Sequence, residues 1–128
     1  MKTGGKAVAG ARLLLIVDDE PDMCWVLEHI LNKNGFNTKK ALSGIKALDL
    51  MKQHRFFLAF VDVKLPDVDG LDLARQMRKL EPSMAVVLVS GYFYRDDVAI
   101  QQALSQGLIN SFISKPFQQE EILKAVAM

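Results

Sequence analysis

The sequence LLLIVDDEP, at residues 13–21, is the most informative stretch for predicting the fold. Its five aliphatic residues do not alternate with polar ones, which predicts a strand buried on both faces of a parallel sheet. The three acids that follow stand where such a strand would end. Pro21 suits the first turn of a helix, because a residue there needs no backbone N–H donor. A strand, a polar turn and a helix are therefore expected in succession.

Four more units of the same kind follow along the chain. We expect strands at residues 37–42, 56–61, 85–89 and 111–114, each followed by apolar residues of helical period. Repeated units of this kind predict an α/β fold, with a parallel sheet covered by helices on both faces. The second and fifth strands are the most polar, which favours placing them at the edges. The expected architecture is a doubly wound, five-stranded parallel sheet in the order 2-1-3-4-5.

Apolar residues at intervals of three and four predict which face of each helix is buried. By this criterion Val26 belongs to the buried face of the first helix. Ile45 belongs to that of the second helix and Leu80 to that of the third.

Composition excludes several classes of protein. Half of the 128 residues are hydrophobic and 24% are charged, which is ordinary for one globular domain. The formal net charge is +1, so no basic field favours nucleic-acid binding. Apolar runs reach only about six residues, against the ~20 of a membrane span. Cys24 is the single cysteine and cannot form an internal disulfide.

The first residues differ from the rest of the chain. Residues 1–12 are rich in Gly, Ala and Lys and have no periodicity, so we interpret them as a flexible leader. They lack the apolar segment of a signal peptide, which favours a cytoplasmic location. Residues 13–128 are expected to form one domain.

Polar residues with complementary chemistry stand at the ends of the predicted strands. Asp18 and Asp19 follow the first strand, Asp62 the third, Ser90 the fourth and Lys115 the fifth. In open α/β sheets, ligands bind beyond the carboxyl ends of the strands. The first and third strands are neighbours in the proposed order, so the three acids converge. Carboxylates this close repel unless a cation is present, and an open site with few protein ligands favours Mg²⁺.

This set of groups suits phosphoryl transfer. An aspartate near Mg²⁺, an ammonium and a hydroxyl can attack a phosphoryl group and become an acyl phosphate. The charge distribution agrees, because nine of the fifteen acids fall in or beside loops at this end of the sheet. They are Asp18, Asp19, Glu20, Asp22, Asp62, Asp67, Asp69, Asp96 and Asp97.

Four segments, in this order, resemble the receiver domain of response regulators in bacterial two-component signalling. They are residues 15–21, 61–70, 89–91 and 114–117, and the similarity runs from about residue 12 to the end of the chain. The resemblance implies the flavodoxin-like receiver fold. It also implies a role for each residue at the strand ends.

By this resemblance Asp62 is the phosphoacceptor. Mg²⁺ is bound by Asp18, Asp19, Asp62 and the backbone carbonyl of Lys64. Ser90 is the switch hydroxyl, Lys115 contacts the phosphoryl group, and Phe112 is the rotating switch residue. The family also implies a cis peptide bond between Lys115 and Pro116.

The implied function is a signalling switch and not an enzyme, apart from slow loss of its own phosphoryl group. The donor is a histidine kinase or phosphotransfer protein. The face formed by the fourth helix, fifth strand and fifth helix changes its preference for a downstream effector, and a dimer through this face is a further expectation. We expect no membrane contact and no direct nucleic-acid contact. Residues 119–128 end without a helix cap, which favours a longer response regulator, with transcription control as one output.

Some positions depart from the family pattern. Leu108 replaces a small residue, and Phe112 lacks the hydroxyl that Tyr has there. Residues 92–94 read Tyr-Phe-Tyr and either cover the fourth helix or form a partner surface. Lys64 and Tyr92 occupy positions that influence loss of the phosphoryl group in the family. Their large side chains predict a long-lived phosphorylated state.

Three alternatives remain. A Mg²⁺-dependent phosphatase with an aspartyl nucleophile would need Asp-x-Asp after the first strand, whereas Asp18 and Asp19 are adjacent. A flavodoxin-like redox carrier would need a phosphate loop where the acids stand. A receiver-like interaction module that is never phosphorylated would not need the full set of acids, hydroxyl and lysine.

Overall fold

The structure is a computed structural model that describes residues 12–91 and 96–127. Five strands pair in parallel in the order β2-β1-β3-β4-β5, which confirms the predicted α/β sheet. The strands are β1 (Leu13–Val17), β2 (Asn37–Ala41), β3 (Leu58–Val61), β4 (Ala85–Gly91) and β5 (Ser111–Lys115).

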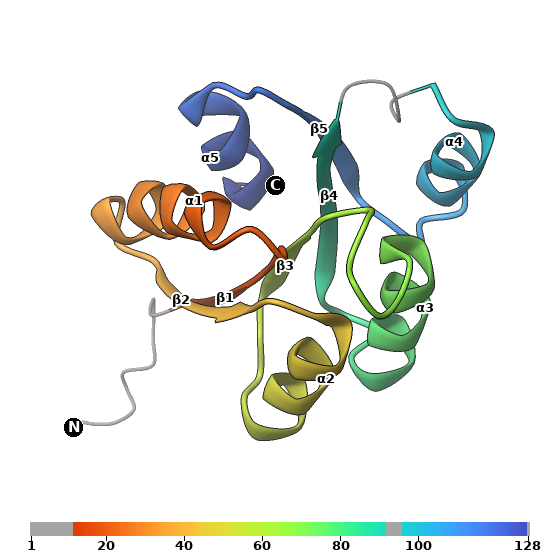
Figure 1. Ribbon diagram of the computed structural model, residues 1–128, viewed down its shortest axis with the longest axis horizontal. Helices are drawn as coiled ribbons and strands as arrows, with labels where there is room; N and C mark the ends of the chain where they lie inside the picture. The colour runs from red at the N-terminus through yellow and green to blue at the C-terminus, as the bar shows by residue number, and fades with distance from the viewer. Residues whose placement is uncertain (1–11, 92–95, 128) are drawn as a thin grey trace.

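A helix follows each strand. The helices are α1 (Pro21–Lys33), α2 (Gly44–Gln53), α3 (Gly70–Leu80), α4 (Val98–Ser105) and α5 (Gln119–Ala127). Figure 1 shows α1 and α5 on one face of the sheet and α2, α3 and α4 on the other. The sheet is therefore doubly wound. None of the described helices is long and apolar enough to cross a bilayer.

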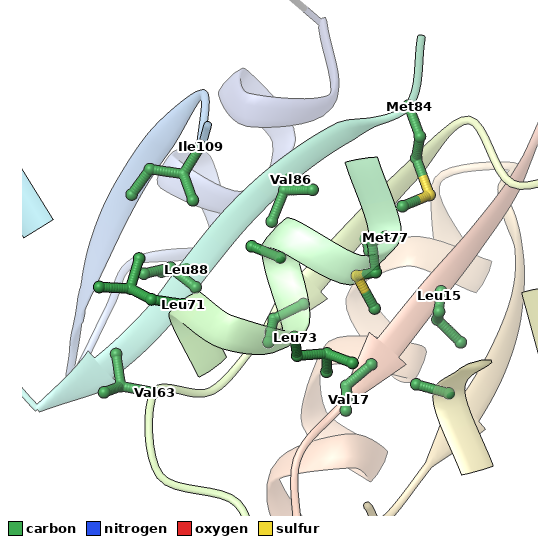
Figure 2. Close-up of a cluster of buried hydrophobic side chains, with 14 of the residues drawn as sticks. Leu15, Val17, Val63, Leu71, Leu73, Met77, Met84, Val86, Leu88 and Ile109 are labelled. Carbon is green, nitrogen blue, oxygen red and sulfur yellow. The ribbon is translucent and has the colours of Figure 1, made fainter. Parts of the chain in front are cut away.

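Each face of the sheet has its own hydrophobic core, because successive strand residues point to opposite faces. On β1, Leu14 and Ile16 pack with α1 and α5, whereas Leu15 and Val17 pack with α2, α3 and α4. Figure 2 shows the second core, in which Met77 of α3 lies over the sheet. The unbroken aliphatic run of β1 thus reflects burial on both sides.

Three residues predicted to be buried are exposed. Val26 is 36% exposed, Ile45 64% and Leu80 51%. The buried face of α1 contains Cys24, Leu27, Ile30 and Leu31, and Val26 lies outside this face. The buried residues of α2 are the small Gly44 and Ala47, and those of α3 end at Met77.

Four strand boundaries differ from those predicted. β2 ends at Ala41 and not at residue 42, and β4 continues to Gly91, two residues beyond residue 89. β3 begins at Leu58 and not at residue 56. Phe57, just before it, is half-exposed, and the centroid of its ring lies 4.4 Å from the guanidinium carbon of Arg12. β5 extends to Lys115, one residue further than predicted. Residues 1–11 of the predicted leader and Tyr92, Phe93 and Tyr94 lie outside the described residues.

Candidate functional site

The carboxyl ends of β1 and β3 bring the acids together. Val17 is paired with Val61, so the next residues of these neighbouring strands, Asp18 and Asp62, lie side by side. The backbone N–H of Asp62 donates to the carbonyl of Val17 at 2.9 Å, which extends the ladder up to the site. Asp18, Asp19 and Asp62 each place one carboxylate oxygen in a group whose members all lie within 4.8 Å of one another. The predicted convergence of the three acids is confirmed.

Asp62 lies between a hydroxyl and an ammonium. It is 8% exposed, and its Oδ1 accepts a 2.6 Å hydrogen bond from Oγ of Ser90, which is also buried. Its Oδ2 lies 3.5 Å from Nζ of Lys115. These partners stand at the ends of β4 and β5, whose pairing aligns Gly91 with Lys115. Four strands therefore deliver the groups around one carboxylate.

Asp18 is the most deeply buried acid of the site, with 2% of its surface exposed. Its Oδ1 accepts from the backbone N–H of Glu20 and its Oδ2 from Nζ of Lys115, both at 2.9 Å. Burial raises the pKa of Asp18, and the charge of Asp62 adds to this effect. The hydrogen bond from Glu20 and the hydrogen bond and charge of Lys115 lower the pKa without cancelling the rise.

Lys115 is the cation of the cluster and is mostly buried. Burial by itself lowers the pKa of its ammonium. The hydrogen bond to Asp18 and the charges of Asp18, Asp62 and Glu20 outweigh burial, so the pKa of Lys115 is raised. The peptide bond from Lys115 to Pro116 is cis, as the family resemblance implied.

The donor set fits a hard divalent cation. Three carboxylates converge beside one ammonium, and that of Glu20 lies 3.9 Å from the same ammonium, so negative charges outnumber the positive one. Negative charge contributes to both raised pKa values. The charge of Asp62 adds to the larger effect of burial on the pKa of Asp18, and the charges of Asp18, Asp62 and Glu20, with the hydrogen bond to Asp18, outweigh burial at Lys115. Asp19 is exposed, so one side of the cluster is open to solvent. Oxygen ligands with room for water are what Mg²⁺ prefers.

The segment that follows Asp62 returns tightly to the sheet. Lys64 pairs with Asp69 as an isolated antiparallel bridge, and the N–H of Gly70 donates to the carbonyl of Val63 at 2.7 Å. A side chain at Gly70 would overlap the carbonyl oxygen of Asp62 and lie 2.8 Å from Cα of Val63. Only glycine therefore lets α3 begin this close to the acceptor strand. The side chain of Lys64 is exposed.

Phe112 lies below the cluster and not in it. Phe112 of β5 is paired with Leu88 of β4, and Leu88 stands two residues before Ser90 on that strand. Its half-buried ring packs against the core on the side of α2, α3 and α4, as does Leu108. The switch role of Phe112 stays a prediction.

Sequence reasoning missed one residue near the site. The carboxylate of Asp67, interpreted only as a loop residue, accepts from the backbone N–H groups of Gly44 and Ile45, each at 2.9 Å. These two hydrogen bonds lower the pKa of Asp67. Their partners are more than 20 residues away in the sequence, so no local pattern links them.

A five-stranded parallel sheet with acids, a hydroxyl and a lysine at its carboxyl edge defines a receiver-type α/β domain. Comparison with known families gives the same result. The family model for the response regulator receiver domain matches residues 14–127. The chain belongs to this family, whose members are signalling proteins.

Relatives of different lengths share this domain. Sporulation initiation phosphotransferase F of Bacillus subtilis is 33% identical over 113 residues, which cover 88% of this chain and 89% of that protein. Response regulator MprA of Mycobacterium sp. (strain KMS) is 31% identical over 110 residues. Those residues cover 86% of this chain but only 46% of MprA. The chain thus spans most of one relative and about half of the other.

A solved structure supports the fold assignment. The response regulator TrrA from Thermotoga maritima, in complex with Mg²⁺-BeF, superposes with a TM-score of 0.79 at 26% identity. The match covers 91% of this chain and 96% of that one.

Proposed function

We propose that the domain is a phosphorylation-dependent switch in which Asp62 accepts a phosphoryl group from a phosphohistidine. The observation that carries the proposal is the setting of the Asp62 carboxylate. It lies between the hydroxyl of Ser90 and the ammonium of Lys115, and within 4.8 Å of two further carboxylates. The complex of TrrA with Mg²⁺-BeF supports the same assignment.

The chemical step is a displacement at phosphorus. A carboxylate oxygen of Asp62 attacks the phosphorus atom, and a P–O bond forms as the P–N bond of the phosphohistidine breaks. The electron pair of that bond returns to the imidazole nitrogen of the donor. Lys115 supplies positive charge to the phosphoryl oxygens, and the Ser90 hydroxyl donates a hydrogen bond to one of them.

Asp18, Asp19, Asp62 and the backbone carbonyl of Lys64 would hold Mg²⁺. When bound, Mg²⁺ neutralises charge on the phosphoryl oxygens. The excess negative charge of the acid cluster supports this assignment.

Switching begins with Ser90. Its hydroxyl leaves Asp62 for the new phosphoryl group, and Phe112 moves into the space behind it. The position of Phe112 in the ladder, two residues before Ser90 on the neighbouring strand, supports this coupling. The face made of α4, β5 and α5 then changes its affinity for an effector or for a second copy of the domain.

The proposed partners follow from the family. A histidine kinase or phosphotransfer protein supplies the phosphoryl group, and an effector domain or protein reads the state. Coverage of about half of MprA supports a role as the regulatory domain of a longer regulator, with transcription control as one output. The cytoplasmic location and the absence of direct contact with nucleic acid stay predictions.

The test is incubation with Mg²⁺ and a small phosphodonor such as acetyl phosphate, followed by mass spectrometry. We expect wild type to gain one phosphoryl group and Asp62→Ala to gain none. Asp72→Asn, which changes an exposed acid of α3 outside the site, is the control and should behave like wild type. No gain on wild type would favour an unphosphorylated interaction module. Steady release of phosphate from esters would favour a phosphatase.

The lifetime of the phosphorylated state is a separate proposal. We propose that the large side chains of Lys64 and Tyr92 shield the acyl phosphate from water. A half-life of seconds after removal of the donor would contradict this.

A further inference from the structure

The segment between β3 and α3, residues 62–69, contacts a second helix besides the one it leads into. Asp67 accepts hydrogen bonds from the N–H groups of Gly44 and Ile45, the first two residues of α2. Because a carboxylate is the acceptor of both, these are charge-assisted hydrogen bonds. The negative charge also stands at the positive end of the helix dipole.

The contact completes the cap of α2. The first N–H groups of a helix have no partner within it. Ser43 takes one of them, because its Oγ accepts from the N–H of Lys46, while its carbonyl accepts the first regular helical bond from Ala47. The N–H groups of Gly44 and Ile45 donate to the carboxylate of Asp67. One part of the cap is therefore local, and another part comes from the segment that follows Asp62.

Packing accompanies these hydrogen bonds. A side chain at Gly44 would overlap Cγ1 of Val68 and approach Oδ1 of Asp67 to 3.4 Å. Val68 is half-buried against the core on the side of α2, α3 and α4. The absence of a side chain at Gly44 thus lets the segment approach α2 closely.

The other end of the segment is fixed on α3. Oδ1 of Asp69 accepts from the N–H of Leu71 at 2.8 Å, and Gly70 is bonded to Val63. Lys64 lies in sequence between Val63, which is bonded to Gly70, and Asp67, which is bonded to α2. It also pairs with Asp69. The backbone that follows Asp62 is therefore held from both sides, by α3 directly and by α2 through Asp67.

We propose that Asp67 is a positioning residue for the metal site: its attachment to α2 holds the backbone of Val63 to Val68 so that the carbonyl of Lys64 is presented to Mg²⁺. The proposal rests on the proposed function, since it needs Mg²⁺ at Asp18, Asp19 and Asp62. Residues that orient metal ligands without touching the metal typically change affinity by 10- to 100-fold.

The experiment compares three variants with wild type. Asp67→Ala removes the attachment, and Gly44→Ala displaces Val68 while keeping every charge. Ser43→Ala is the matched control, because it removes the local side-chain hydrogen bond of the α2 cap and leaves the segment untouched. Calorimetry measures the Kd for Mg²⁺, and hydrogen exchange of residues 63–69 is followed without metal.

We expect Asp67→Ala and Gly44→Ala to raise the Kd about tenfold and to speed exchange in residues 63–69. Ser43→Ala should do neither. Wild-type affinity in Asp67→Ala, or an equal loss in Ser43→Ala, would overturn the proposal. A loss in Asp67→Ala alone, with Gly44→Ala like wild type, would assign the effect to charge and also overturn it. Absence of Mg²⁺ binding by wild type would instead contradict the proposed function, and unchanged exchange in Asp67→Ala would still refute the attachment.

Discussion

Ser90 and Asp62 are joined by a 2.6 Å hydrogen bond between two almost fully buried side chains. The bond links the ends of β3 and β4 and occupies Oδ1 of the proposed acceptor. Asp62 cannot keep this bond unchanged when its carboxylate becomes an acyl phosphate, because the phosphoryl group adds competing acceptor oxygens. The hydroxyl is thus placed to sense the chemical state of Asp62.

Ser90→Ala should separate phosphoryl uptake from switching. Asp62, the acids and Lys115 remain, so the variant should still gain a phosphoryl group from acetyl phosphate, more slowly because one donor is lost. Backbone amide NMR of residues 108–115 should shift on phosphorylation of wild type but hardly in the variant. Ser105→Ala, which removes a hydroxyl bonded within α4, is the control and should respond like wild type. Equal shifts in Ser90→Ala would rule out the role of this hydroxyl.

Asp18 should make the metal-free protein less stable as the pH rises. Burial raises the folded-state pKa of Asp18 above 3.8, so the stabilising effect of its bound proton is complete below 3.8. That effect is lost as the pH rises through the raised pKa. Urea unfolding of metal-free protein across this range should show the loss in wild type and a flatter profile in Asp18→Asn. Asp49→Asn, an exposed acid of α2, should leave the profile unchanged.

Bound Mg²⁺ should offset the loss of folding stability that the acid cluster causes. At a concentration of 100 times its Kd, a ligand that binds only the folded state stabilises it by about 2.7 kcal/mol. We expect this gain in wild type and a much smaller one in Asp18→Asn, measured by urea unfolding with and without Mg²⁺. An equal gain in both proteins would show that Asp18 is not a ligand.

Gly70→Ala should disturb the acceptor strand directly. A methyl group at this position would overlap the carbonyl oxygen of Asp62, and backbone cannot move aside as a flexible side chain can. Overpacking of this kind costs about 1–3 kcal/mol, and we expect the upper end of that range. The variant should also take up phosphoryl groups more slowly. Gln76→Ala, exposed on the same helix, should change neither property.

The sequence alone predicted the parts of the molecule that depend on local pattern. The unbroken aliphatic run of β1 predicted burial on both faces, and the polar strands β2 and β5 are at the edges of the sheet. Asp18, Asp62 and Lys115 could be placed because parallel strands end at a common edge. The predicted strand order was therefore enough to place these residues in one site.

What the sequence did not predict depends on how closely elements approach. Ile45 fits an apolar period but is exposed, because α2 packs through Gly44 and Ala47. Arg78 of α3 donates to the carbonyls of Leu108, Pro82 and Met84 and to Asn110, joining segments up to 32 residues away. The contacts of Arg78, like those of Asp67, correspond to no spacing in the sequence, because they form only when the helices pack in the folded structure.

Cys24 offers a measure of local or global opening that needs no engineered residue. Burial, and next to it the charge of Asp18, raise the pKa of its thiol to about 11. At pH 8 only about one thiol in a thousand would be ionised even if it were accessible. Its Sγ donates to the carbonyl of Asp18 at 3.3 Å, so the thiol lies directly behind the acid cluster.

Thiol labelling should therefore report unfolding and its suppression by metal. As the single cysteine, Cys24 gives a signal that needs no assignment. Reaction with a disulfide reagent should be slow in native protein and rapid in denaturant, because only the open state exposes the thiolate. At 100 times its Kd, Mg²⁺ should slow labelling of wild type about 100-fold by depleting the open state, but should hardly slow labelling of Asp18→Asn. Native labelling as fast as in denaturant would contradict burial of Cys24, and an equal effect of Mg²⁺ on both proteins would contradict metal binding by Asp18.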